Sequence, residues 1–174
     1  MKRAFASLTV QEALHVAILI EERNAELYHR FAEVFLEFRD SESLEIASVF
    51  WEMAVEECQH SSMLQGKYLD LYGNSRCGLT EEDLADLIEV PSLDHGDILA
   101  ATYESCRPDA RERALRVALI TEQSAQAYYA ALLQTTPVGP LRQLYIELAQ
   151  MEDSHAAHLE HKLAPRPVTD SRVN

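Results

Sequence analysis

The sequence predicts an all-α fold, a four-helix bundle made of two helical hairpins that are joined by a long crossover containing short helices. Three observations support this prediction. Only five of the 174 residues are glycine, and long segments rich in Ala, Leu and Glu favour helix. Apolar residues recur every three or four positions over four long stretches, which is the helical period. The second half of the chain also repeats the pattern of the first.

The first hairpin is predicted from two helices with a short link. Thr9 and Glu12 have the spacing of a capping box, which predicts a helix from there to about Phe38. The segment FRDSESLE can end this helix and cap the next, which is expected from near Ser43 to about Leu71. A link this short makes the helices antiparallel. The apolar stripe of the first helix comprises Val10, Leu14, Ala17, Ile18, Ala25, Tyr28, Ala32 and Phe35.

The connection between the hairpins is predicted to hold short helices. TEEDLADLIE (80–89) is one such piece, which Pro91 stops, and a second is expected at 94–105. The connection, from about 73 to 107, is long enough to cross the bundle. It therefore allows the hairpins to lie around a pseudo-twofold axis.

The second hairpin has the same organisation as the first. Pro108 suits a first helical turn, and the helical period continues over 109–134 and again over 141–163, on either side of the break TTPVGP. We expect residues 1–164 to form one bundle domain. The tail 165–174 has no apolar stripe and is expected to be flexible.

An internal repeat places the same polar residues in both hairpins. Without a gap, EALHVAILIEERNAELY (12–28) aligns with RALRVALITEQSAQAYY (113–129), and WEMAVEECQHSSML (51–64) aligns with IELAQMEDSHAAHL (146–159). The first helix of each half therefore carries an equivalent Glu and Tyr, and the second helix carries an equivalent Glu–x–x–His. In sequence order these residues are Glu21, Tyr28, Glu57, His60, Glu122, Tyr129, Glu152 and His155.

The repeated acids lie on helix faces that are otherwise apolar. Residues three apart project from one face, so Glu57 with His60, and the equivalent pair of the second hairpin, can present a carboxylate and an imidazole to one centre. Glu21 and Glu122 also fall on inward stripes. Four buried acids would each cost several kcal/mol or stay protonated. Two divalent cations would cancel their charge.

The donor set limits the choice of cation. Four carboxylates and two imidazoles without a thiolate suit two hard or borderline ions that share bridging carboxylates, which indicates iron or manganese before zinc. The alternative is a buried polar network without metal, which would have to neutralise four acids with no Lys or Arg on the inward stripes. One Glu–x–x–His arises by chance, but two in register with two further glutamates match the ligand set of di-metal carboxylate bundles.

The four long stretches resemble the rubrerythrin branch of the ferritin-like superfamily. The matching segments are VAILIEERNAELY, EMAVEECQHSSML, VALITEQSAQAYY and ELAQMEDSHAAHL, whereas 73–107 are not covered. The resemblance implies a ferritin-like four-helix bundle with a di-iron centre, for which manganese or a mixed pair is an alternative. Glu57 and Glu152 are the preferred bridges. The six implied ligands are Glu21, Glu57, His60, Glu122, Glu152 and His155.

Two tyrosines have two interpretations. Tyr28 and Tyr129 lie two turns from Glu21 and Glu122, and the resemblance implies that they hydrogen-bond ligating carboxylates across the bundle. In the other interpretation they are core tyrosines whose hydroxyls are satisfied elsewhere. Both interpretations stay open at this point.

The neighbouring polar residues are expected at the surface. His158 and His161 lie one and two turns beyond His155, where they are expected to face solvent near the helix end; a surface metal site is the alternative. Cys58 lies about 100° round the helix from Glu57 and is expected to miss the centre. The acids interpreted as solvated are Glu22, Glu26, Glu52, Glu56 and Glu147.

The resemblance implies an oxidoreductase that reacts with O2 or peroxide. An external electron donor is expected, because Cys58, Cys77 and Cys106 form no rubredoxin-like CxxC pairs. Family members that reduce peroxide carry an additional Glu where this chain has Ala125, so oxidase, peroxidase and ferroxidase chemistry all stay open. The alternatives are an iron-handling protein for storage or delivery, without an organic substrate, and a metal-free helical interaction domain.

The charge limits the partners. A net charge of −14 argues against a nucleic-acid partner and against an anionic membrane, since both need a basic face. No stretch is long enough to span a bilayer, and Gln11, Glu12 and His15 interrupt the first apolar run, so no cleaved signal is expected. The scattered cysteines favour a cytoplasmic protein. The sequence does not fix the oligomeric state, and a homodimer is compatible with it.

Overall fold

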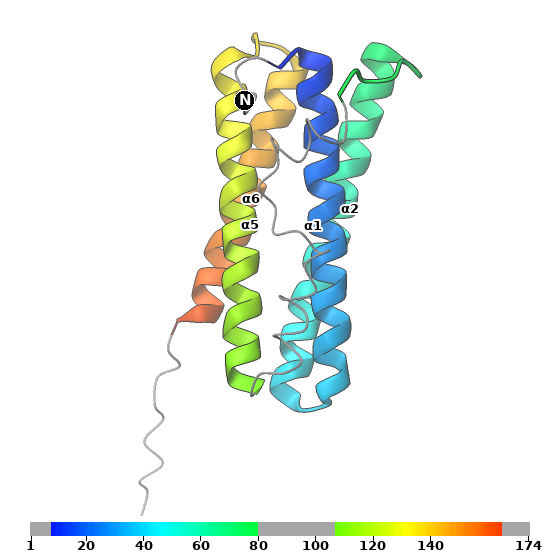
Figure 1. Cartoon of the computed structure of the whole chain (residues 1–174). Helices are drawn as coiled ribbons and strands as arrows, with labels where there is room; N and C mark the ends of the chain where they lie inside the picture. The colour runs from blue at the N-terminus through cyan, green and yellow to red at the C-terminus, as the bar shows by residue number, and fades with distance from the viewer. Residues whose placement is uncertain (1–7, 80–106, 165–174) are drawn as a thin grey trace, which may run out of the picture.

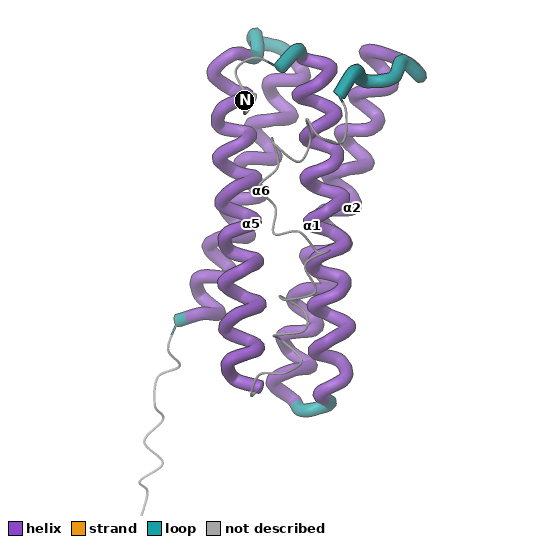
Figure 2. Tube along the Cα trace, viewed as in Figure 1, coloured by secondary structure: helices purple, strands orange, loops and turns teal. Residues whose placement is uncertain are grey.

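In a computed structural model, the structure describes residues 8–79 and 107–164 of the chain, and within these ranges every regular element is an α-helix. Figure 2 shows loops only at the helix ends. This confirms the all-α prediction for the described part of the chain. None of these helices combines the length and the apolar character that crossing a bilayer requires. The helices are α1 (Val10–Phe38), α2 (Ser41–Tyr72), α5 (Arg107–Thr135) and α6 (Pro140–Leu163).

The four helices lie side by side as a bundle (Figure 1). Most contacts join α1 to α2 and α5 to α6, so the bundle consists of the two predicted hairpins. Helix α2 ends and α5 begins at opposite ends of the bundle. The helical pieces predicted at 80–89 and 94–105, the crossover that contains them, and the tail 165–174 lie outside the described residues.

Capping residues define the start of α1 and the tight connection between α1 and α2. The Thr9 hydroxyl accepts a hydrogen bond from the Glu12 amide at 3.2 Å, and the Glu12 carboxylate accepts one from the Thr9 amide at 2.8 Å. This is the predicted capping box. Helix α1 ends at Phe38, and the next residue, Arg39, has a φ of 57° in the left-handed region. Asp40 then caps α2 by accepting from the Ser43 amide at 2.9 Å, and a link this short makes the helices antiparallel.

The core has two apolar parts with a polar band between them. On α1, residues 13–20 belong to one part and 27–35 to the other. On α5 the corresponding ranges are 125–132 and 114–118. Each helix therefore passes from one apolar part to the other through its repeated Glu. Of the stripe predicted for α1, only Val10 departs from the prediction: it is 45% exposed in the first turn, whereas the other seven members are buried.

Phe50 is the centre of an aromatic cluster in the second apolar part. Its side chain is fully buried, and its ring centroid lies 5.1 Å from that of Phe31 and 6.1 Å from those of Tyr28 and Phe35. Such rings contribute both buried area and favourable mutual geometry. This cluster stabilises the packing of α2 against α1.

We therefore expect Phe50→Ala to lower the free energy of unfolding by about 3–5 kcal/mol, because it leaves a cavity among the rings. Urea denaturation of the metal-free protein measures this change. Leu44→Ala is the matched control on the same helix, since Leu44 is 46% exposed, and it should change the free energy by at most about 0.5 kcal/mol. Equal effects of the two substitutions would contradict the placement of the cluster.

Candidate metal centre

Six acidic and imidazole side chains meet in the polar band of the bundle. The four glutamates are fully buried, His60 is 4% exposed, and His155 is half-buried. They form two groups, and within each group the potential ligand atoms all lie within 4.8 Å of one another. The structure thus brings together all six residues predicted as ligands. The first group is Glu21, Glu57, His60 and Glu152, and the second is Glu57, Glu122, Glu152 and His155.

Both imidazoles direct the same ring nitrogen into the cluster. Nδ1 of His60 lies 3.2 Å from Oε2 of Glu21 and 3.3 Å from Oε2 of Glu57. Nδ1 of His155 lies 3.3 Å from Oε2 of Glu122 and 3.2 Å from Oε1 of Glu57. Glu57 therefore presents one oxygen to each ring. This follows from its spacing of three residues from His60 and from the approach of α6 to α2.

The two repeated tyrosines form reciprocal hydrogen bonds between the hairpins. The hydroxyl of Tyr28 on α1 donates to Glu122 on α5, and the hydroxyl of Tyr129 on α5 donates to Glu21 on α1. Both tyrosines are fully buried. The structure thus places each hydroxyl on a predicted ligand of the opposite hairpin, which is one of the two interpretations left open by the sequence.

In the absence of cations, the cluster balances its charge with protons. Burial raises the pKa of Glu21 to about 8, and the neighbouring Glu57 adds to the rise. Burial and the charge of Glu57 also hold the pKa of Glu152 well above its usual range. Burial acts in the same direction on Glu57 itself, but contacts with His155 and His60 outweigh it and lower its pKa to about 2.

The imidazoles are held in the charged form by the acids around them. Burial alone would lower their pKa values. The contacts with Glu21 and Glu57 outweigh burial and raise the pKa of His60 to about 9. Contacts with Glu122 and Glu57 likewise raise the pKa of His155 to about 11.

The two buried carboxylate oxygens of Glu152 indicate whether the cluster is suited to metal ions. Both are inaccessible to solvent, and neither has a hydrogen-bond donor among the described residues. Unpaired buried acceptors are costly in a folded protein, and cations between the helices would satisfy them. The donors are carboxylates and imidazoles, which are common metal ligands. The residues therefore fit metal ions.

Glu56 was predicted to be a solvated flanking acid and is exposed, but it also makes a contact that the sequence did not indicate. Its side chain is 53% exposed, but its Oε2 lies 2.6 Å from Nε2 of His155. It thus contacts the ring nitrogen that points away from the cluster. The contact joins the two hairpins, and no spacing rule within a helix relates positions 56 and 155.

Asn24 was overlooked by the sequence analysis. It lies on α1 between Glu21 and Tyr28, and it is fully buried. Neither its amide nitrogen nor its oxygen has a hydrogen-bond partner among the described residues. The signal was available, because Asn24 is a polar residue on an apolar stripe and the repeat aligns it with Ala125.

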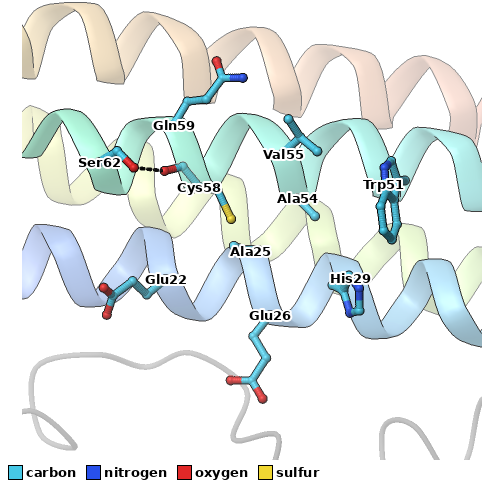
Figure 3. Close-up of a pocket in the computed structure, with 10 residues that line it drawn as sticks. All are labelled: Glu22, Ala25, Glu26, His29, Trp51, Ala54, Val55, Cys58, Gln59 and Ser62. Atoms are coloured by element: carbon cyan, nitrogen blue, oxygen red, sulfur yellow. Dashed lines mark hydrogen bonds between the residues drawn. The ribbon is translucent and has the colours of Figure 1, made fainter.

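Two cavities lie near the cluster. The smaller, of about 210 Å³, opens between α2 and α6 beside His155, and Glu52, Glu56 and His158 line it together with apolar and serine side chains. The larger, of about 680 Å³, lies over α1 and α2 (Figure 3) and is lined largely by apolar atoms, including those of Trp51. None of the six clustered residues lines the larger cavity.

The remaining surface predictions can be compared with the structure. His158 and His161 are exposed, as expected near the end of α6. Cys58 belongs to neither group of clustered donors, as expected; it is exposed and lines the larger cavity. Glu22, Glu26, Glu52 and Glu147 are exposed as well.

Comparisons of the chain with protein-family models, with curated proteins and with solved structures find no match. The functional assignment therefore rests on the residues and their geometry.

The raised pKa values predict how the stability of the metal-free protein depends on pH. The pKa of Glu21 is about 8 and that of His60 about 9 in the folded state, against ordinary values of 4.5 and 6.5. The folded state then binds protons more tightly than the unfolded state, so this stabilisation is complete below about pH 4.5 and is lost as pH rises through about 8 to 9. The lowered pKa of Glu57 makes stability rise with pH instead, but this contribution changes only below about pH 4.5.

We therefore expect the melting temperature in the presence of a chelator to fall between about pH 5 and about pH 9. Glu21→Gln, which cannot titrate at this position, should flatten the lower part of this decline. A melting temperature that rises with pH over the same range would contradict the prediction.

Proposed function

We propose that this chain is a non-haem di-iron carboxylate protein of the rubrerythrin type within the ferritin-like superfamily. In this proposal it is an oxidoreductase that reacts with O2 or peroxide. The observation that carries the proposal is the pair of overlapping donor groups in the middle of the bundle, each with one imidazole and three carboxylates. Bound cations would explain why four acids are buried together and why both oxygens of Glu152 lack a hydrogen-bond partner among the described residues.

The overlap of the groups suggests a role for each residue. Glu57 and Glu152 belong to both groups, which suits carboxylates that bridge two ions. The remaining donors belong to one group each, which suits terminal ligands. In this assignment Glu21 and His60 hold one ion, and Glu122 and His155 hold the other; manganese or a mixed pair fits the same donors.

When bound, two iron ions would supply the electrons and the Lewis acidity with which O2 or peroxide is reduced. The protein contributes orientation, exclusion of bulk water and proton release. Tyr28 and Tyr129 hold terminal carboxylates in place, and the apolar parts of the core close the centre at both ends. Glu21 and the two imidazoles release protons when cations bind.

The electrons come from a separate donor in this proposal. Cys58 and Cys77 are free, and they provide no four-thiolate iron site within the described residues. The expected cytoplasmic location and the homodimer stay predictions, as does the absence of nucleic-acid and membrane partners.

A second function, iron handling by ferroxidase chemistry, is favoured by one observation. The small cavity beside His155 is lined by acids and a further histidine, which suits the passage of ferrous ions from solvent to the centre. Ala125 is 2% exposed and adds no fifth carboxylate, in contrast to family members that reduce peroxide. In this version iron is the substrate and no organic molecule is turned over.

Metal analysis tests both versions. Protein produced with iron and kept anaerobic should retain about two iron ions per chain, and Glu152→Ala should lose most of this iron because it removes a carboxylate common to both groups. Glu147→Ala, which changes an exposed acid on the same helix, should retain the iron. A wild-type protein without bound metal would instead support a metal-free interaction domain.

Oxidation of the iron-loaded protein separates the two versions. Reoxidation that is much faster with hydrogen peroxide than with O2 supports peroxidase chemistry, whereas repeated ferrous oxidation with retained ferric mineral supports iron handling. If neither oxidant reacted with the loaded protein, both versions would be wrong.

The tyrosine contacts predict a graded loss of metal affinity. Tyr28→Phe and Tyr129→Phe each remove a hydrogen bond to a terminal carboxylate, and we expect each to weaken metal binding by about 10- to 100-fold. Tyr128→Phe is the matched control, because the hydroxyl of this buried neighbour donates to the backbone oxygen of Ala13 at 2.8 Å. Competition with a chromophoric chelator measures the affinities, and equal effects in all three variants would argue against the orienting role.

A further inference from the structure

We infer that the two metal positions are unequal and fill in order, the position at His155 before the position at His60. The His155 position is defined by Glu57, Glu122, Glu152 and His155, and the His60 position by Glu21, Glu57, His60 and Glu152. In this inference Glu56 is a positioning residue that makes the His155 position the tighter one, and the small cavity beside it is the entrance. The inference rests on the proposed metal centre.

The first step of the argument is the environment of the two ring nitrogens of His155. Nδ1 points into the cluster, 3.3 Å from Glu122 and 3.2 Å from Glu57. Nε2 lies 2.6 Å from the carboxylate of Glu56, so the proton on this nitrogen is held by an acceptor outside the cluster. With its proton fixed on Nε2, the ring keeps the Nδ1 lone pair for a cation and becomes a stronger donor.

The second step is that the repeat does not reproduce this contact. The alignment of the hairpins pairs Glu56 with Met151, whose side chain is 39% exposed. A thioether is a weak acceptor and carries no charge. The contacts of His60 with acids in the described ranges all run through Nδ1, so its Nε2 has no equivalent carboxylate there.

The third step is access. The cavity of about 210 Å³ reaches His155 from the surface between α2 and α6, and Glu52 and Glu56 line it. These carboxylates attract a dication to the opening. His60 is 4% exposed and lines neither of the two cavities described above. An ion entering by this route meets the donors of the His155 position first.

Equilibrium titration with Co²⁺ tests the inference without measuring activity. Metal-free protein should bind two ions in two steps whose affinities differ by about 10- to 100-fold, the size expected of one outer carboxylate. Two half-centre variants identify the steps. Glu21→Gln should keep the tight step and lose the weak one, whereas Glu122→Gln should lose the tight step. Absorption of bound Co²⁺ and calorimetry provide the stoichiometry and both affinities.

A matched pair of variants tests Glu56 itself. Glu56→Ala should weaken the tight step by about 10- to 100-fold and leave the other step unchanged. Glu56→Gln keeps an acceptor for the Nε2 proton without the charge and should restore part of the affinity. Glu147→Ala changes an exposed acid outside the cavity whose described hydrogen bond is to Gln143, and it should leave the equilibrium affinities unchanged. Thermal melting confirms that each variant is folded.

The outcomes distinguish this inference from the proposed function. If wild-type protein bound no Co²⁺, the metal centre itself would be refuted. If two ions bound with equal affinity, if Glu21→Gln removed the tight step, or if Glu147→Ala weakened binding as much as Glu56→Ala, the centre would stand and the inference would be refuted.

Discussion

The burial of four carboxylates in one cluster is the constraint on which the rest of this structure depends. Charge of one sign in a low-dielectric interior is unfavourable unless protons, cations or hydrogen-bond donors compensate it. In the metal-free chain the compensation comes from protons on Glu21 and Glu152 and from two imidazolium rings. The position of the cluster between two apolar parts of the core makes this compensation obligatory, because water does not reach the glutamates.

The compensation is shared between the hairpins. Each buried tyrosine hydroxyl donates to an acid of the other hairpin, and Glu57 of α2 lies within 3.2 Å of a ring nitrogen of α6. Neither hairpin therefore completes the polar cluster by itself. The approximate symmetry of the contacts follows from the repeat in the sequence, and Glu56 with Met151 is a pair at which that symmetry is broken.

The sequence was sufficient for the four described helices and for the six clustered residues, because both depend on local rules. The helical period, the Thr9–Glu12 capping box and the spacing of Glu57 and His60 act within one helix, and the repeat indicated which faces meet. The prediction that Val10 belongs to the buried stripe was wrong, because a residue in the first turn of a helix can fit the apolar period and still lie beyond the ends of the neighbouring helices.

Contacts between hairpins were harder to predict, because they depend on how far one helix is rotated and shifted against another. The meeting of Glu56 and His155 is of this kind, and no pattern within α2 or α6 contains it. The predicted crossover lies outside the described residues, and the ferritin-like relationship stays a prediction.

The distribution of contacts has a consequence for how the bundle moves. The helices of one hairpin contact each other much more than they contact the other hairpin. Separating the two hairpins therefore breaks fewer packing contacts than separating the two helices of one hairpin, so local opening is easiest along the plane between the hairpins. The tyrosine hydrogen bonds and any bound ions cross this plane, so occupancy of the centre would slow amide hydrogen exchange on the facing sides of α1 and α5, far beyond the ligands themselves.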